Sequence, residues 1–209
     1  MAVTLQDIAP ADIEAESFRI IAGEIGDHSF DPLTFKVVQR VIHATGDFSF
    51  AENMRFSPGA IEAGIKAIRD GKNILTDVTM VAAGISKALL NKYGGEVICK
   101  VADPVVAEAA KNATKTRSEM AISMNLDDSI GIVAMGNAPT ALVQAIRTSA
   151  EMKGVKPLLV GVPVGFVNAA ESKALLVEQN SCYITSLGRK GGSPVAAAIV
   201  NALIRLAAE

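Results

Sequence analysis

His43 is the side chain in this sequence best suited to proton transfer. It is predicted to lie in the last turn of a helix that ends before Gly46. The carbonyl end of a helix dipole favours the imidazolium form, so this position suits a general acid. A histidine in the last helical turn can equally serve as a structural cap, and the local sequence leaves both roles open.

Two arginines are candidates for binding carboxylates. Arg117 lies in TKTRSEM and Arg189 in LGRKGG, and a guanidinium can bind a carboxylate through paired hydrogen bonds. Both are also compatible with a solvated surface. Arg189 is the stronger candidate, because two glycines and a predicted helix start follow it directly.

Three glycine-containing segments extend this predicted anion site: AMGNAPT, GVPVGF and GRKGGS. Glycine permits close backbone approach and unusual dihedral angles, and the helices predicted to follow offer unpaired N–H groups. None of the three segments matches GxxxxGK[ST] or GxGxxG. A nucleotide site is therefore the weaker alternative.

Metal chemistry has little support in the sequence. Cys99 and Cys182 lie far apart in apolar, strand-like runs and are predicted to be buried thiols. The chain has two histidines and no close grouping of cysteine with histidine. We therefore expect no zinc site and no other bound metal.

Strand-like and helical segments alternate from residue 73 onward, and this pattern predicts where the candidate residues lie. Five strand-and-helix pairs in succession predict an α/β fold, a mostly parallel sheet with helices on both faces. Ligands bind such sheets beyond the carboxyl ends of the strands, where the glycine segments occur. The predicted pairs are 73–77 with 78–90, 96–101 with a helix from 104, 129–137 with 138–153, 157–165 with 169–178, and 181–186 with 194–208.

The first seventy residues are predicted to be a helical N-terminal segment. Its helices cover 10–25, 32–45 and 57–71, the second with Asp31 as N-cap and Pro32 in its first turn. We expect residues 1–209 to form a single domain, because this length supports one sizeable core.

Composition excludes several classes of partner. The net charge is −2 and the basic residues are scattered, so we expect no nucleic acid as partner. No apolar run reaches the length of a membrane span, so we expect no membrane association. Acidic residues near the N-terminus argue against a signal peptide, and a cytoplasmic location is expected.

Taken in order, the segments resemble the precorrin-8X methylmutase family of cobalamin biosynthesis, whose anaerobic members act on cobalt-precorrin-8. The resemblance covers nearly the whole chain. One departure is Asn168, where glycine is frequent in the family. The segments that carry the resemblance are AESFRII, VIHATGDF, FSPGAIEAG, ILTDVTMVAAGI, GEVICKVADP, KTRSEMA, AMGNAPTAL, VGVPVGFVNAAESK and GRKGGSPVAAAIVNAL.

The resemblance implies an isomerase that needs no cofactor. The expected reaction is an intramolecular shift of a methyl group from C11 to C12 of the macrocycle, giving hydrogenobyrinate or cobyrinate. It also implies a homodimer that binds its corrin-precursor substrate near the subunit interface. By the same resemblance His43 is catalytic, and the substrate-binding residues are Ser17, Asp77, Arg117, Gly136, Asn137, Thr140, Gly165, Phe166, Arg189, Gly191, Gly192 and Ser193.

Three other functions use the same features differently. A nucleotide- or S-adenosylmethionine-dependent transferase would use the strand-end loops for its cofactor. A non-catalytic tetrapyrrole carrier would need the apolar slot without His43. An interaction module would bind no small ligand. None of these explains the ordered set of segments.

Overall fold

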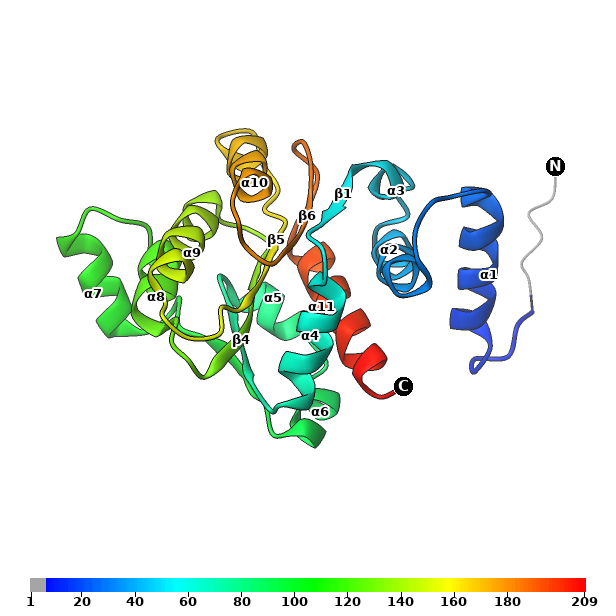
Figure 1. Ribbon diagram of the computed structural model, residues 1–209, viewed down its shortest axis with the longest axis horizontal. Coiled ribbons are helices and arrows are strands. Elements are labelled where there is room, and N and C mark those ends of the chain that lie inside the picture. Colours follow the sequence, from blue (N-terminus) through cyan, green and yellow to red (C-terminus); the bar gives the residue numbers. More distant parts are fainter. Residues whose placement is uncertain (1–6) are drawn as a thin grey trace.

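A six-stranded sheet runs through the centre of the molecule (Figure 1). The structure is a computed structural model that describes residues 7–209. The strand order is β1-β6-β5-β4-β2-β3, and all neighbours are parallel except β1 and β6. The strands are β1 (Met54–Phe56), β2 (Asn73–Thr76), β3 (Val97–Cys99), β4 (Ile130–Met135), β5 (Leu158–Gly161) and β6 (Tyr183–Ser186).

The strand order creates a switch point between β2 and β4. From β2 the chain moves to β3 on one side, and from β4 it moves to β5 on the other. The connections at the carboxyl ends therefore diverge between these two strands, where parallel α/β sheets commonly bind ligands. Asp77 follows β2 and Gly136 follows β4 directly at this point.

Helices cover both faces of the sheet, as predicted. Alternate residues of β4 point to opposite faces: Ile132 and Ala134 face α11, α4 and α5, whereas Val133 and Met135 face α8, α9 and α10. The bounds are α4 (Ala60–Arg69), α5 (Thr79–Gly84), α6 (Lys87–Leu90), η1 (Asn91–Tyr93), α7 (Pro104–Asn112), α8 (Arg117–Asn125), α9 (Pro139–Glu151), α10 (Ala169–Glu178) and α11 (Ser193–Ala207).

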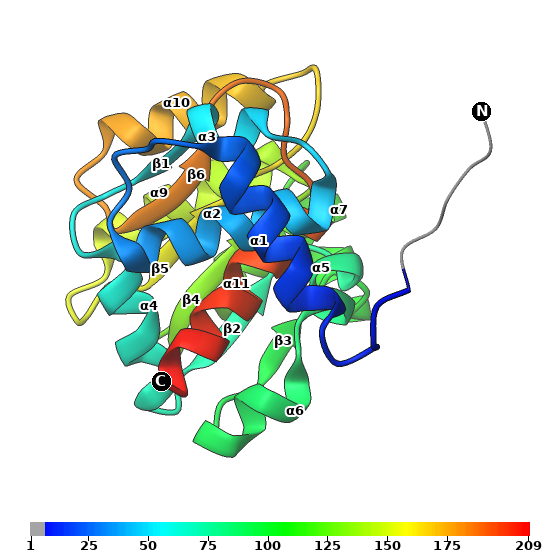
Figure 2. The same cartoon turned by 90° about the vertical axis from the view of Figure 1, so that its right-hand side faces the viewer.

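The helical N-terminal segment adds a further layer over α11. Helix α2 (Pro32–Thr45) packs along α11, and α1 (Ile13–Ile25) crosses α2 on its outer side (Figures 1 and 2). As a result α11 is almost entirely buried. Helix α2 begins and ends as predicted: the Asp31 carboxylate accepts hydrogen bonds from the N–H groups of Leu33 and Thr34, and Gly46 adopts a left-handed conformation.

Two local predictions were wrong. Residues 49–56 form a short helix, α3 (Ser49–Asn53), and the strand β1, which pairs with the edge strand β6. The helix predicted over 78–90 breaks between α5 and α6, where the Ser86 N–H donates to Asn201 Oδ1 at 2.8 Å. A side chain of α11 thus replaces the helical carbonyl that this N–H would otherwise use.

No helix within residues 7–209 combines the length and the hydrophobicity needed to cross a membrane.

Candidate active site

Asp77 is the most deeply buried of the predicted site residues that can ionise, and its side chain is fully buried. Its carboxylate accepts hydrogen bonds from the backbone N–H groups of Gly136 at 3.2 Å, Asn137 at 2.8 Å and Ala138 at 2.8 Å. Burial raises the pKa of Asp77, although the three N–H groups act in the opposite direction. The carboxylate therefore joins the carboxyl ends of β2 and β4.

This arrangement changes the expected role of the loop before α9. The sequence predicted that the N–H groups of this loop bind an anion of the substrate. Within one chain, however, the N–H groups of Asn137 and Ala138 already donate to the carboxylate of Asp77. The side chain of Asn137 is exposed. Its amide is the part of this residue that is free to contact a ligand.

The glycines of the site bring three loops together. A Cβ on Gly136 would lie 2.7 Å from Ser193 Cα, and a Cβ on Gly191 would lie 2.2 Å from the carbonyl oxygen of Val162. The N–H of Gly192 donates to this same carbonyl at 2.8 Å. Close packing of the loops after β4, β5 and β6 therefore requires glycine at these positions.

An apolar, positively charged rim stands above these loops. Phe166 is 84% exposed, and the Arg189 guanidinium carbon lies 5.4 Å from the centre of its ring. The N–H of Gly165 donates to the Arg189 carbonyl at 3.2 Å. Neither Arg189 nor Arg117 forms an ion pair with any residue in the described range 7–209. A flat, acidic ligand would find both apolar surface and charge here.

His43 lies in the last turn of α2 and is exposed. Its imidazole meets the ring of Phe18 edge-on, with 5.4 Å between the ring centres. Phe18 also carries the guanidinium of Arg40 over its face at 4.6 Å. The neighbouring Ser17 donates its hydroxyl hydrogen to the Ile13 carbonyl at 2.9 Å. The imidazole is thus held at one side and open at the other.

A cavity shares Phe18 with the surroundings of this histidine, but His43 is not part of its lining. Its volume is about 590 Å³, and it lies between α1, α2, α6, η1 and the C-terminal part of α11, toward the amino ends of the strands. Phe18 and Arg40 belong to its lining, and Arg40 is one helical turn before His43. Phe18 therefore connects this cavity with the imidazole.

Arg117 and Thr140 lie on the other side of the sheet. Arg117 begins α8, and the hydroxyl of its predecessor Thr116 lies 2.8 Å from the hydroxyl of Thr140 in α9. A cavity of about 310 Å³ opens beside Thr140 and Asn168. Helices α8 and α2 occupy opposite faces of the sheet (Figure 1). A single chain therefore does not bring Arg117 next to His43.

The backbone conformation of Asn168 accounts for asparagine at this position, where glycine is frequent in the family. It precedes α10 with φ 59°, in the left-handed region. Glycine adopts this conformation most readily, and asparagine is among the few other residues that tolerate it. The exchange of glycine for asparagine therefore preserves the loop.

Three residues that hold the site together were not singled out from the sequence. Lys173 is fully buried in α10, and its ammonium donates to the Lys190 carbonyl at 2.6 Å. Burial lowers the pKa of Lys173 to about 8. The side chain of Lys190 in turn pairs with Asp47 at 2.6 Å, which lowers the pKa of Asp47 to about 2. The sequence did contain one signal that Lys173 is buried, because it lies at helical spacing from the buried Ala169 and Leu176.

Within residues 7–209, no three His, Cys, Asp or Glu side chains come together in a way that could hold a metal ion. Cys99 and Cys182 are free thiols, but each is only partly buried, so the prediction that both are buried was wrong.

Comparison with known proteins places this geometry in a family. A family model described as precorrin-8X methylmutase matches residues 12–206. A cobalt-precorrin-8 methylmutase from Priestia megaterium is 44% identical, over 96% of this chain and 89% of that protein. A precorrin-8X methylmutase from Pseudomonas aeruginosa is 38% identical, over 91% of this chain and 93% of that protein.

A solved structure agrees with the sequence comparisons. The precorrin-8x methyl mutase from Thermus thermophilus has a TM-score of 0.86 to this structure at 45% identity, and the match covers 95% of this chain and 96% of that one. Because the similarity extends over nearly the whole chain in both sequence and structure, this protein belongs to the precorrin-8X methylmutase family.

Proposed function

We propose that His43 is the general acid of this methylmutase and that the substrate, precorrin-8X or its cobalt form, binds beyond the carboxyl ends of the strands. Family membership makes the chain an isomerase of cobalamin biosynthesis that moves a methyl group from C11 to C12 of the macrocycle. The observation that carries the proposal is the exposed imidazole of His43, held edge-on by Phe18 at the end of α2, where the following segment contacts the loop after β6.

The methyl shift needs one proton donor. A proton given to a ring nitrogen or to the conjugated system redistributes its electrons. The bond from C11 to the methyl carbon then breaks as the bond to C12 forms, and the proton returns to the base. General acid catalysis of this kind contributes a factor of about 10² to 10⁴. Tighter binding of the rearranging macrocycle than of the resting substrate would supply the remainder.

The acidic arms of the substrate need cations. Arg189 stands beside the exposed ring of Phe166, which can cover a flat macrocycle while the guanidinium binds a carboxylate. Arg117 is exposed and adjoins Thr140 through Thr116. We assign these two arginines to the acetate and propionate arms, with the hydroxyl of Thr140 and the amide of Asn137 as further contacts.

The separation of His43 from Arg117 supports a homodimer with the site near its interface. The two residues lie on opposite sides of one sheet, so both reach the same substrate if one comes from each subunit. The free thiols of Cys99 and Cys182 are compatible with the reducing cytoplasm, where we place the enzyme.

His43→Ala tests the proposed acid. We expect kcat to fall about 10²- to 10⁴-fold with an unchanged circular dichroism spectrum, because the side chain is exposed. Turnover is followed by the visible spectrum of precorrin-8X or its cobalt form.

His28→Ala is the matched control, since His28 is the other histidine of the chain and is also exposed. It is expected to keep the wild-type rate. A wild-type rate in His43→Ala would refute the assignment of the acid.

A further inference from the structure

The loop between β6 and α11, residues 187–192, is fixed from the core. It carries Arg189 and the paired glycines. The N–H of Leu187 donates to the Asn53 carbonyl and that of Gly192 to the Val162 carbonyl, each at 2.8 Å. The Lys190 carbonyl accepts two more hydrogen bonds, from the ammonium of Lys173 at 2.6 Å and from Ser186 Oγ at 3.1 Å.

Lys173 is an unusual donor for such a task. It is fully buried and forms no ion pair with a described residue. Burying an ammonium is costly unless it is well satisfied. A buried charge directed at one backbone carbonyl fixes the position of that carbonyl and therefore the direction in which the side chain of Lys190 leaves the loop.

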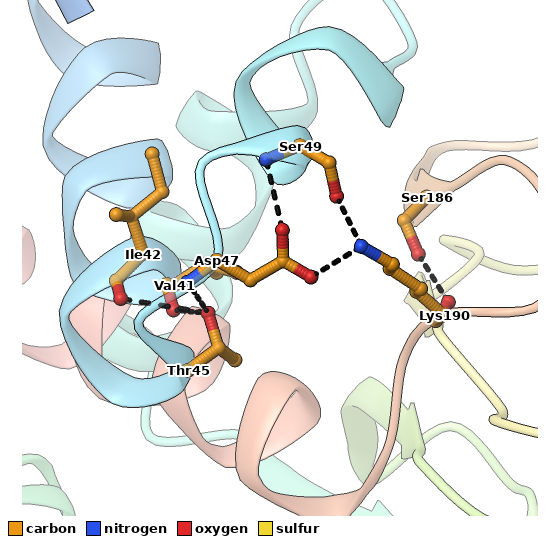
Figure 3. A network of polar contacts seen from close by, with 7 residues as sticks. All are labelled: Val41, Ile42, Thr45, Asp47, Ser49, Ser186 and Lys190. Atoms are coloured by element: carbon orange, nitrogen blue, oxygen red, sulfur yellow. Dashed lines mark hydrogen bonds and ion pairs between the residues drawn. The ribbon is translucent and has the colours of Figure 1, made fainter.

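The side chain of Lys190 reaches across to the segment that follows α2 (Figure 3). Its ammonium lies 2.6 Å from Asp47 Oδ2 and 3.0 Å from Ser49 Oγ. The other carboxylate oxygen of Asp47 accepts from the N–H of Ser49 at 3.0 Å, so the acceptor is itself fixed at the start of α3.

The same segment is bonded to the helical turn that carries His43. The N–H of Asp47 donates to Thr45 Oγ1 at 3.3 Å, and this hydroxyl donates to the Val41 carbonyl at 2.8 Å (Figure 3). Residues 41 and 45 bracket His43 on α2. An unbroken set of contacts thus leads from buried Lys173 through Lys190 and Asp47 to the turn of the proposed acid.

We propose that Lys190 and Asp47 are positioning residues for the methyl shift. Their pair, which we call the loop clamp, fixes the β6–α11 loop with Arg189 relative to the end of α2 with His43. The proposal rests on the proposed function, because it takes Arg189 as a substrate-binding residue and His43 as the acid. The clamp holds the distance between carboxylate anchor and proton donor, and displacements of about 1 Å in an active site can cost about 100-fold in rate.

Lys190→Met and Asp47→Asn test the clamp. Each keeps the size of the side chain and removes one charge, and the pair is exposed enough that global stability should change little. We expect each substitution to lower kcat about tenfold, and the double variant to be no worse than either single one, because one shared interaction is lost in all three. Lys190→Arg should restore most of the loss.

The Asp47 variant separates the clamp from direct substrate binding by Lys190. If Lys190 bound a substrate carboxylate itself, Lys190→Met would mainly raise KM, and Asp47→Asn would free the ammonium and leave activity intact or improve it. Such opposite effects would overturn the proposal. Lys66→Met is the matched control: it breaks the exposed pair of Lys66 with Asp70 on α4 and should leave kcat and KM unchanged.

A readout without turnover keeps the clamp distinct from the acid assignment. Hydrogen exchange of the amides in residues 187–192 should accelerate in Lys190→Met and in Asp47→Asn, and not in Lys66→Met. Unchanged exchange would refute the clamp whatever His43 does. Faster exchange with wild-type kcat would refute its catalytic role, and both results are independent of the activity of His43→Ala.

Discussion

Lys173 carries a measurable penalty for its burial. Its pKa is lowered from an ordinary 10.5 to about 8 because burial disfavours the ammonium. Between these two values the unfolded chain binds a proton that the folded chain has released. The free energy of unfolding therefore gains up to about 1.4 kcal/mol per pH unit from this residue as pH rises from about 8 toward 10.5.

Lys173→Met isolates this contribution. Methionine fills a similar volume without a charge. The variant should therefore lack the increase in the free energy of unfolding that the wild type shows above pH 8. Urea unfolding of both proteins at steps of half a pH unit measures the difference between their free energies of unfolding. The titration of all other groups contributes equally to both proteins and cancels in this difference. A difference that stays constant from pH 7 to 10 would show that Lys173 keeps its ordinary pKa in the folded protein.

The sequence could identify candidate side chains but not their partners. Asp77 is an example: its place after a strand was read from the alternation, yet its three hydrogen bonds to residues 136–138 join strands that are not consecutive in sequence. Its carboxylate occupies the N–H groups that the sequence predicted to be available to a ligand. Long-range pairing of this kind also hid the contact between Asp47 and Lys190, which are 143 positions apart.

Among the elements, the loops after β4, β5 and β6 depend on glycine for their packing. Gly191→Ala would place a Cβ 2.2 Å from the backbone oxygen of Val162. Backbone cannot move aside as a flexible side chain can, so we expect a loss of about 2–3 kcal/mol in the free energy of unfolding, measured by chemical denaturation. Displacement of Arg189 should raise KM at the same time.

Gly188→Ala is the comparison within the same loop. Gly188 has φ +77°, but a Cβ there meets nothing within 4 Å. Its cost is the left-handed conformation alone, about 1–2 kcal/mol. If both variants lost the same stability, crowding against Val162 would not be the reason for glycine at position 191.

Elements with strong local signals could be predicted, and those set by tertiary contacts could not. Helix α2 has a capping aspartate, a proline in its first turn and a terminal glycine, and its predicted bounds were confirmed. Strand β1 has three residues and exists because β6 offers a free edge. The break between α5 and α6 likewise depends on Asn201, which is more than a hundred residues away.

At the scale of the whole molecule, the proposed acid and one of the proposed substrate-binding arginines lie on opposite faces of one sheet. His43 belongs to the layer over α11, and Arg117 begins a helix on the other face (Figures 1 and 2). The proposed twofold dimer would let both residues contact one substrate, because it can bring the His43 side of one chain against the Arg117 side of its partner. Exposed apolar side chains at Phe166, Val167 and Met80 are compatible with such an interface.

Mixed dimers test this arrangement. His43→Ala and Arg117→Ala are each expected to lose most activity alone. When the two variants are unfolded together and refolded, about half of the dimers contain one chain of each kind. If each site takes His43 from one chain and Arg117 from the other, each mixed dimer has one intact site, and activity returns to about a quarter of the wild-type value. Light scattering should give a mass about twice the 21.8 kDa of one chain. If each variant is inactive alone, activity that stays at that level in a solution shown to contain mixed dimers would mean that both residues serve the same chain's site.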